Sequence, residues 1–144
     1  MIWKTPVDLH TINTWSKNTL AGLLGIVFTH VDDNSLTAIM PIDQKLMQPM
    51  GSMHGGASCV LAETVGSVAA NFCVDQSIKM CVGLEINVNH LRPVLLGHLS
   101  VVTAIASLLH LGKTTQVWDI KIRDEQKKLV AISRLTVAVI DQKK

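Results

Sequence analysis

One long apolar run with helical spacing constrains the fold of this chain more than any other feature. Between Gly55 and Cys73 the apolar side chains recur at intervals of three and four residues, which predicts a single long helix. They are Ala57, Val60, Leu61, Val65, Val68, Ala69 and Phe72. The opposite side of this helix carries the small residues Cys59, Ala62, Gly66 and Ala70, so we expect a second backbone to approach it closely.

The segments around this helix predict mainly β-structure. Before it, Leu9 to Leu20 are expected to form a short helix, and a hairpin follows, with strands at Gly25 to His30 and Ser35 to Met40 around the turn at Asp32 to Asn34. After it, four sequential antiparallel strands are expected at Cys81 to His90, Leu99 to Ser107, Thr115 to Arg123 and Leu129 to Val139. The breaks between them are Pro93 to Gly97, Gly112 to Lys113 and Asp124 to Lys128. This order predicts an α+β fold in which the long helix covers a curved antiparallel sheet.

Length and composition predict one domain that associates with copies of itself. A chain of 144 residues is long enough for one core, so residues 1–144 are expected to form a single domain. Hydrophobic residues make up 48% of the chain and the mean hydropathy is +0.34, while aromatic residues are only 3%. Such an aliphatic excess predicts apolar surface hidden between subunits, in a homo-oligomer that is a dimer or a tetramer.

Charge and hydropathy exclude several other classes of protein. The net charge is +2 and the only tight basic group is Lys143 with Lys144, so no nucleic-acid partner is expected. An early lysine, a proline and an acid interrupt the N-terminal residues where a signal peptide needs an apolar stretch, which predicts a cytoplasmic protein. No apolar segment reaches the roughly 20 residues of a membrane span, so no membrane association is expected.

The thiol and imidazole side chains show no spacing typical of a metal site. Cys59, Cys73 and Cys81 lack the C-x-x-C pattern and are expected to be reduced, buried thiols. The six histidines show no H-E-x-x-H spacing, so we expect no metal. The chain also lacks a G-x-S-x-G nucleophile elbow and any Walker or dinucleotide glycine pattern. Cys59 is a poor candidate nucleophile because an apolar helix raises the pKa of a thiol.

Glu63 is the first candidate for chemistry because it stands alone in the apolar helical run. Burying a carboxylate there is costly without a partner or a function. Ser67, four residues later, shares its helix face. His54, Gly55 and Gly56 lie where the helix begins, and the first N–H groups of a helix can donate to an oxygen that develops negative charge. This combination favours acyl transfer from an ester or a thioester.

Simpler interpretations of the same residues remain open from the sequence. The His-Gly-Gly segment could be only a turn and a helix start, and Glu63 could be a structural acid that pairs with a lysine or faces a solvated subunit seam. Gln48 could be an ordinary loop residue. His90 and His110 have the character of common surface or core histidines, and a lone Ser67 is ordinary at a helix interface.

Three segments together resemble a known family. They are Q-P-M-G-S-M-H-G-G-A-S-C-V-L-A-E-T-V-G-S at Gln48 to Ser67, V-G-L-E-I-N-V-N-H-L-R at Val82 to Arg92, and H-L-G-K-T-T-Q-V-W at His110 to Trp118. The opening M-I-W-K and the M-P-I-D at Met40 to Asp43 agree with them. Over nearly its whole length the chain resembles the hotdog-fold acyl-CoA thioesterases of the PaaI-like group. Within that group it is most similar to the branch that serves menaquinone and enterobactin synthesis.

This resemblance implies a dimer or tetramer with active sites between subunits, and it implies roles for individual residues. Glu63 is the implied nucleophile or general base, and the Gly55 N–H polarises the carbonyl. His54 and Gln48 position substrate and water, and Ser67 sits beside the acyl group. The implied coenzyme A groove consists of Gly83, His90, Leu91, Arg92, Pro93, His110, Leu111, Gly112, Lys113, Thr114 and Thr115, with Arg92 and Lys113 as the phosphate contacts.

The expected activity is hydrolysis of an acyl-CoA thioester, with no cofactor because CoA is part of the substrate. We expect an aromatic acyl group, such as 1,4-dihydroxy-2-naphthoyl, rather than a long aliphatic one. Direct attack by the carboxylate and activation of water stay open. Two other functions also stay open: a hotdog enoyl-CoA hydratase or dehydratase, and a non-catalytic module that senses acyl-CoA.

Overall fold

The computed structural model describes residues 1–98 and 100–142. Leu99, Lys143 and Lys144, which entered the sequence analysis, lie outside these described residues. The elements in chain order are α1 Leu9–Ser16, α2 Leu20–Leu23, β1 Val27–Val31, β2 Ser35–Pro41, the 3-10 helix η1 Gln44–Leu46, α3 Gly55–Phe72, β3 Lys79–His90, β4 Val101–Leu111, β5 Thr115–Arg123 and β6 Leu129–Asp141.

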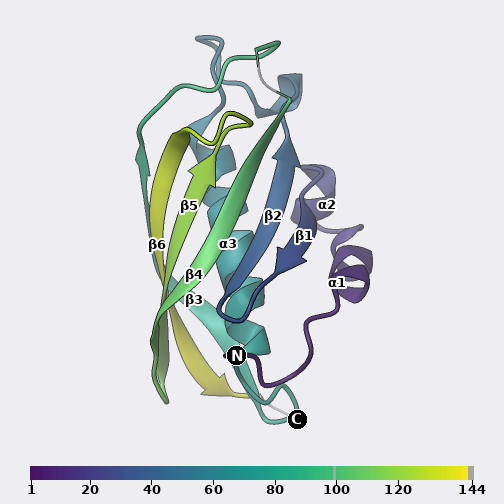
Figure 1. The fold of residues 1–144 in the computed structure, drawn as a ribbon, viewed down its shortest axis with the longest axis vertical. Helices are drawn as coiled ribbons and strands as arrows, with labels where there is room; N and C mark the ends of the chain where they lie inside the picture. Colours follow the sequence, from purple (N-terminus) through teal and green to yellow (C-terminus); the bar gives the residue numbers. More distant parts are fainter. Residues whose placement is uncertain (99, 143–144) are drawn as a thin grey trace.

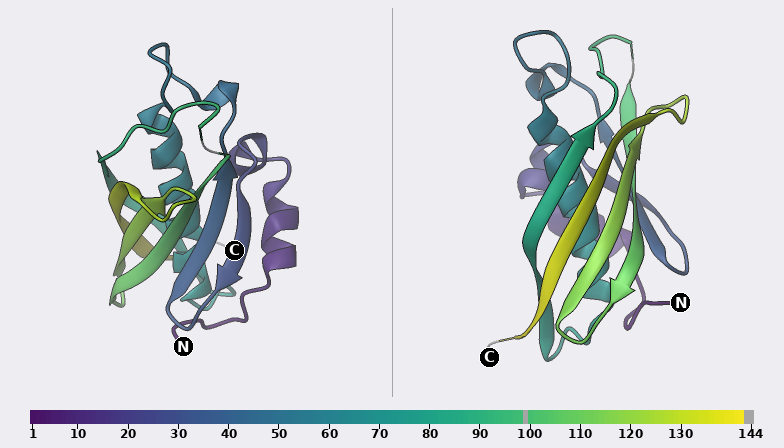
Figure 2. Two further views of the ribbon diagram at one scale, coloured as in Figure 1. Left: turned by 45° about the horizontal axis from the view of Figure 1, so that its top comes forward. Right: turned by 90° about the vertical axis from the view of Figure 1, so that its left-hand side faces the viewer.

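A six-stranded antiparallel sheet curves around α3. The strand order is β1-β2-β4-β5-β6-β3, and α3 lies against one face of the sheet (Figures 1 and 2). The loops that follow β2 and β3 gather at the end of the molecule where α3 begins. This architecture confirms the predicted α+β fold, with a long helix covered by a curved antiparallel sheet.

The last four strands were predicted to lie side by side in the order of the sequence. This prediction is right for β4, β5 and β6 and wrong for β3. The chain leaves β2, crosses the sheet through α3 and enters β3 beyond β6, so β3 pairs with β6 rather than with β4. β4 pairs instead with β2, with Ser35 opposite Ser107 and Pro41 opposite Val101. Alternation of apolar residues identifies strands but does not say which strands are neighbours, because pairing across a crossover is decided by long-range packing.

The helix predicted at Leu9 to Leu20 is two helices, α1 and α2. Thr19 has an extended backbone, with φ −124° and ψ 177°, which ends the helical path. Two hydroxyl groups compete for the carbonyls nearby: Ser16 Oγ donates to Ile12 O at 2.8 Å, and Thr19 Oγ1 donates to Ser16 O at 2.7 Å. Side chains of this kind favour turns over helix interiors, which is why the prediction of one helix was wrong.

The small residues of α3 lie against the chain's own sheet. Ala62, Gly66 and Ala70 are buried as completely as Leu61 on the neighbouring positions. A Cβ atom on Gly66 would lie 2.6 Å from Leu135 Cδ2, so helix and sheet are in close contact there. The expected close approach is therefore made at these three residues by the chain's own sheet, and only Cys59 is half-buried.

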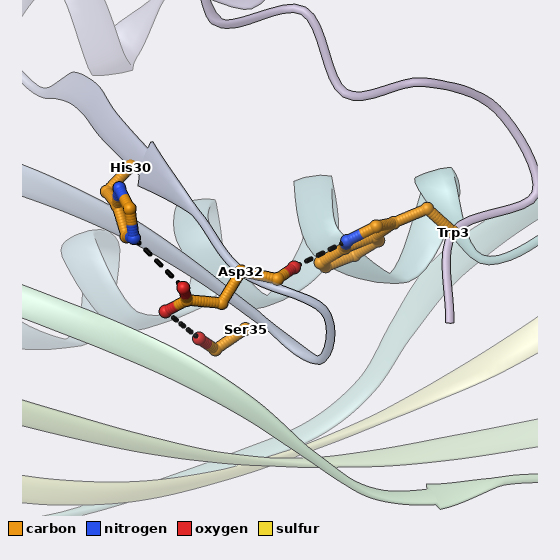
Figure 3. A network of polar contacts seen from close by, with 4 residues as sticks. All are labelled: Trp3, His30, Asp32 and Ser35. Atoms are coloured by element: carbon orange, nitrogen blue, oxygen red, sulfur yellow. Dashed lines mark hydrogen bonds and ion pairs between the residues drawn. The ribbon is translucent and has the colours of Figure 1, made fainter. Parts of the chain in front are cut away.

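The N-terminal segment is tied to the turn between β1 and β2 through Asp32. Trp3 Nε1 donates to the Asp32 carbonyl at 2.7 Å, while the Asp32 carboxylate pairs with His30 at 3.0 Å and accepts from Ser35 Oγ at 3.3 Å (Figure 3). The Trp3 ring also stacks on the buried Trp118 ring, with centroids 6.4 Å apart. These contacts close the end of the core that lies opposite the start of α3.

The cysteines are free, as predicted, and two of them are fully buried. Cys73 and Cys81 are buried whereas Cys59 is half-buried, so the prediction of three buried thiols holds for two. Burial raises the pKa of the Cys73 thiol to about 12 and that of the Cys81 thiol to about 11. Within residues 1–98 and 100–142, no helix combines the length and apolarity that a bilayer crossing demands.

Substituting Gly66 tests the close packing of α3 on the sheet. Gly66→Val should lower the free energy of unfolding by about 2 kcal/mol, because the added side chain meets Leu135 in a filled core. Cys59→Val places the same side chain on the half-buried side of α3 and should cost less than about 1 kcal/mol. Denaturant unfolding measures both, and equal losses would contradict the packing described.

Candidate active site

Glu63 lies over β3 in a cluster that we call the carboxylate half-site, made of Glu63, Ser67 and Gly83. Ser67 Oγ donates to Glu63 Oε1 at 2.6 Å, which fixes one carboxylate oxygen from the same helix. A Cβ atom on Gly83 would lie 2.9 Å from Glu63 Oε1, so only glycine leaves the carboxylate room to lie against the strand. No ion pair among the described residues involves Glu63. The open interpretation of Glu63 as the partner of a lysine therefore lacks support.

A cavity of about 650 Å³ opens beside Ser67, between α3 and the N-terminal helices. Its α3 wall begins at Thr64 and Ser67 and continues through Val68 and Asn71. The N-terminal helices supply an apolar wall of Ile12, Trp15, Leu20 and Ala21, and Met80 and Lys79 of β3 line the remaining side. The carboxylate half-site therefore borders a largely apolar space large enough for a small organic group.

A second cluster, the amide half-site, consists of Gln48, His54, Gly55 and His90 at the start of α3. His54 is the N-cap residue, and its Nδ1 accepts from the Gly56 N–H at 2.8 Å. No hydrogen bond among the described residues uses the Gly55 N–H, so that donor is free for a ligand. A Cβ atom on Gly55 would lie 2.9 Å from His90 Nε2, so the imidazole of β3 lies directly on the helix start.

Gln48 faces the same helix start across a smaller cavity. Its Nε2 donates to Ser52 Oγ at 2.7 Å, and its Oε1 accepts from the Met50 N–H, so the side chain is held within its loop. The cavity has a volume of about 350 Å³. Its lining is Gln48, Ser52, Met53, Gly55, Ser58, His90, Leu91, Arg92, Pro93, Val94 and Val130. Gln48 and the start of α3 thus share one recess with the expected coenzyme A residues at 90–93.

Apart from Gly83, the residues expected to bind coenzyme A fall into two groups at opposite ends of the sheet. His90 to Pro93 lie at the amide half-site, whereas the turn from His110 to Thr115 joins β4 to β5 at the other end of the sheet. The register places Gln116 opposite Val137 and Val137 opposite Gly83, so β6 separates the strand that follows this turn from the strand of the carboxylate half-site. One chain therefore does not bring these residues into a single groove.

The two half-sites of one chain are too far apart to act on the same thioester. Gly55 and Glu63 are eight residues apart on one helix, which separates them by about 12 Å along its axis. A nucleophile and an oxyanion donor must both lie about 3 Å from the reacting group. Within one chain the two residues therefore lie in separate half-sites.

Asn71 and the N-terminal helices are parts of the site that the sequence analysis missed. Asn71 lies four residues after Ser67 on α3, a spacing that could have drawn attention to it. Trp15 carried no such signal, because its position beside α3 depends on how α1 packs. The described residues contain no group of three or more metal-ligating side chains.

Sequence and structure comparisons show the family of this chain. Residues 50–131 match the Thioesterase superfamily. The 1,4-dihydroxy-2-naphthoyl-CoA hydrolase of Escherichia coli is 45% identical over 140 residues, which are 97% of this chain and 100% of that protein.

Two solved structures share both the fold and much of the sequence. A variant of a thioesterase from Pseudomonas aeruginosa superposes with a TM-score of 0.94 at 48% identity, covering 99% of this chain and 100% of that one. A thioesterase from Haemophilus influenzae gives a TM-score of 0.92 at 45% identity, covering 98% and 96%. The chain therefore belongs to the thioesterase superfamily, and it is a thioester hydrolase with the hotdog fold.

Proposed function

We propose that this protein hydrolyses an aromatic acyl-CoA to the free acid and coenzyme A. The observation that carries the proposal is the hydrogen-bonded Glu63 carboxylate beside an apolar cavity, in a chain whose helix start offers a free amide donor. The Escherichia coli relative named as a 1,4-dihydroxy-2-naphthoyl-CoA hydrolase supports this substrate class. No step of the proposed reaction needs a cofactor, and the cytoplasm is the proposed location.

The proposed active site is completed by a second copy of the chain. β3 is an edge strand with no neighbour beyond it among the described residues, and Leu84 on it is 62% exposed. Antiparallel pairing of two β3 strands about a two-fold axis between Ile86 and Asn87 would set Gly83 of one copy beside His90 of the other. The carboxylate half-site of one copy would then meet the amide half-site of the other, in a dimer or a tetramer of two dimers.

In this composite site the thioester carbonyl accepts a hydrogen bond from the Gly55 N–H at the helix start. The positive end of α3 stabilises the oxyanion that forms when the carbonyl carbon is attacked. Glu63 either attacks directly, giving an anhydride that water opens, or removes a proton from the attacking water. His54 and Gln48 help to position the substrate and the water, and both routes release the thiolate of coenzyme A.

The acyl group and the nucleotide are proposed to lie on opposite sides of the carboxylate. The acyl group enters the cavity between α3 and the N-terminal helices, whose apolar wall suits a flat aromatic ring. Coenzyme A follows the composite groove of residues 90–93 from one copy and residues 110–115 from the other. Arg92 and Lys113, both exposed, contact its phosphates.

Neutralising Glu63 tests the proposed mechanism. Glu63→Gln should lower kcat by at least about 1000-fold while KM stays within about threefold, because the substitution removes the attacking or proton-accepting group and keeps the shape. Steady-state release of free thiol from 1,4-dihydroxy-2-naphthoyl-CoA measures both constants. Glu125→Gln is the control: it neutralises an exposed carboxylate that accepts from the Ser100 N–H, and it should leave kcat unchanged. Near-normal turnover of Glu63→Gln would remove Glu63 from the mechanism.

Mixing two inactive variants tests whether the site spans two copies. Glu63→Gln and Gln48→Ala damage different half-sites, so each should be impaired alone. After subunit exchange, about half of the dimers are mixed, and one of the two sites in each mixed dimer carries neither substitution. Activity should rise to about a quarter of the parental value. No recovery after verified exchange would show that each site is built from one chain.

Filling the cavity tests where the acyl group lies. Val68→Phe adds a ring inside the cavity and should lower kcat/KM for 1,4-dihydroxy-2-naphthoyl-CoA by at least about tenfold, because the bulky acyl group is displaced. Acetyl-CoA, whose acyl group ends near Ser67, serves as the control substrate, and its kcat/KM should change less than about twofold. Equal losses for both substrates would place the acyl group elsewhere.

A further inference from the structure

The two edge strands of the sheet are each held by an asparagine from a helix. Asn13 of α1 donates through Nδ2 to Phe28 O at 2.9 Å, and its Oδ1 accepts from the Phe28 N–H at 2.8 Å. Asn71 of α3 binds Cys81 in the same way: its Nδ2 donates to Cys81 O at 3.2 Å, and its Oδ1 accepts from the Cys81 N–H at 2.8 Å. Phe28 and Cys81 are both buried, so each amide side chain replaces the missing neighbouring strand at one residue.

Asparagine fits this position because its side chain offers the donor and the acceptor of a peptide group. Aspartate could accept from the strand N–H but could not donate to the strand carbonyl. Asn71 lines the cavity between α3 and the N-terminal helices, which we call the acyl cavity. Its Nδ2 nevertheless donates to backbone carbonyls and its Oδ1 accepts from a backbone N–H. The amide is therefore occupied within the fold and is not free to bind a substrate.

Only Asn71 is connected to the candidate catalytic carboxylate. Its Nδ2 also donates to Ser67 O at 2.9 Å, and the hydroxyl of the same Ser67 donates to Glu63. Cys81, the strand partner of Asn71, precedes by two residues the Gly83 against which Glu63 lies. Asn71 thus joins the two surfaces that hold the carboxylate, one on α3 and one on β3. Asn13 binds β1, at the opposite edge of the sheet.

We infer that Asn71 is a positioning residue for Glu63. By fixing the start of β3 against α3, Asn71 keeps Gly83 and Ser67 at the distances that orient the carboxylate toward the thioester. This role rests on the proposed function of Glu63. Because the polar atoms of the Asn71 amide are engaged by the protein and act through Glu63, its substitution should lower kcat and spare KM.

A matched pair of substitutions tests this inference. Asn71→Asp and Asn13→Asp make the same change at the two edges, since each loses the donor and sets a carboxylate oxygen against a carbonyl oxygen. Asn71→Asp should lower kcat for 1,4-dihydroxy-2-naphthoyl-CoA by at least about tenfold with KM within about twofold. Asn13→Asp loosens α1, a wall of the acyl cavity, and can therefore raise KM, but it should change kcat less than about twofold even if its melting temperature falls as much as that of Asn71→Asp. Each kcat is calculated from the concentration of folded protein. If Asn71→Asp does not fold, Asn71→Ser takes its place.

A double-mutant cycle separates positioning from general destabilisation. In the Ser67→Ala variant the Glu63 carboxylate has already lost its hydrogen bond from Ser67 Oγ. In that variant, Asn71→Asp should lower kcat by less than about threefold. The inference would be overturned if the effects of Ser67→Ala and Asn71→Asp on kcat were fully additive. It would also be overturned if the Asn13 and Asn71 variants lost kcat equally, or if Asn71→Asp affected KM alone. These results leave the proposed function intact if Glu63→Gln is inactive, whereas an active Glu63→Gln variant would refute both.

Discussion

The spacing of two groups on one rigid helix governs the functional architecture of this protein. Gly55 and Glu63 are separated by about 12 Å along the axis of α3, which places the amide donor and the carboxylate in separate half-sites of one chain. We therefore propose that the two groups act together only when two chains associate. The exposed edge of β3 provides a place for that association, because it runs from the carboxylate half-site to the amide half-site.

The fold supports this arrangement through close contact between α3 and the sheet. Gly66 lets the helix lie directly on Leu135, and Gly83 and Gly55 each leave room for a functional side chain, the carboxylate of Glu63 and the imidazole of His90. At these three points glycine leaves space for a neighbouring side chain and does not adopt an unusual backbone conformation. The helix, held by its buried side chains, then presents its half-buried face to the cavity beside the N-terminal helices.

The sequence predicted the local elements well and their long-range pairing less well. The period of α3 and the limits of β5 were confirmed because both depend on neighbouring residues. The position of β3 beyond β6 was not predicted, since the choice of strand neighbour depends on contacts between residues far apart in the chain. The small residues Ala62, Gly66 and Ala70 show a similar limit: they allow close approach, but the pattern does not say whether a second chain or the chain's own sheet makes it.

The candidate site was recognised from the motif around Glu63, and the family resemblance already implied active sites between subunits; the structure adds which residues lie in each half-site. Asn71 illustrates the difference, because its spacing from Ser67 is visible in the sequence while its hydrogen bonds to Cys81 depend on the path of β3. The cavity walls formed by α1 and α2 likewise depend on how these helices pack against α3, which the sequence pattern does not show.

A crystal structure of the Glu63→Gln variant with intact 1,4-dihydroxy-2-naphthoyl-CoA bound is the most direct test of a site shared between two copies. We expect the thioester carbonyl oxygen to lie about 3 Å from the Gly55 nitrogen of one copy, with the side chain at position 63 of the other copy close to the carbonyl carbon. A thioester bound within one chain, or one remote from position 63, would contradict a shared site.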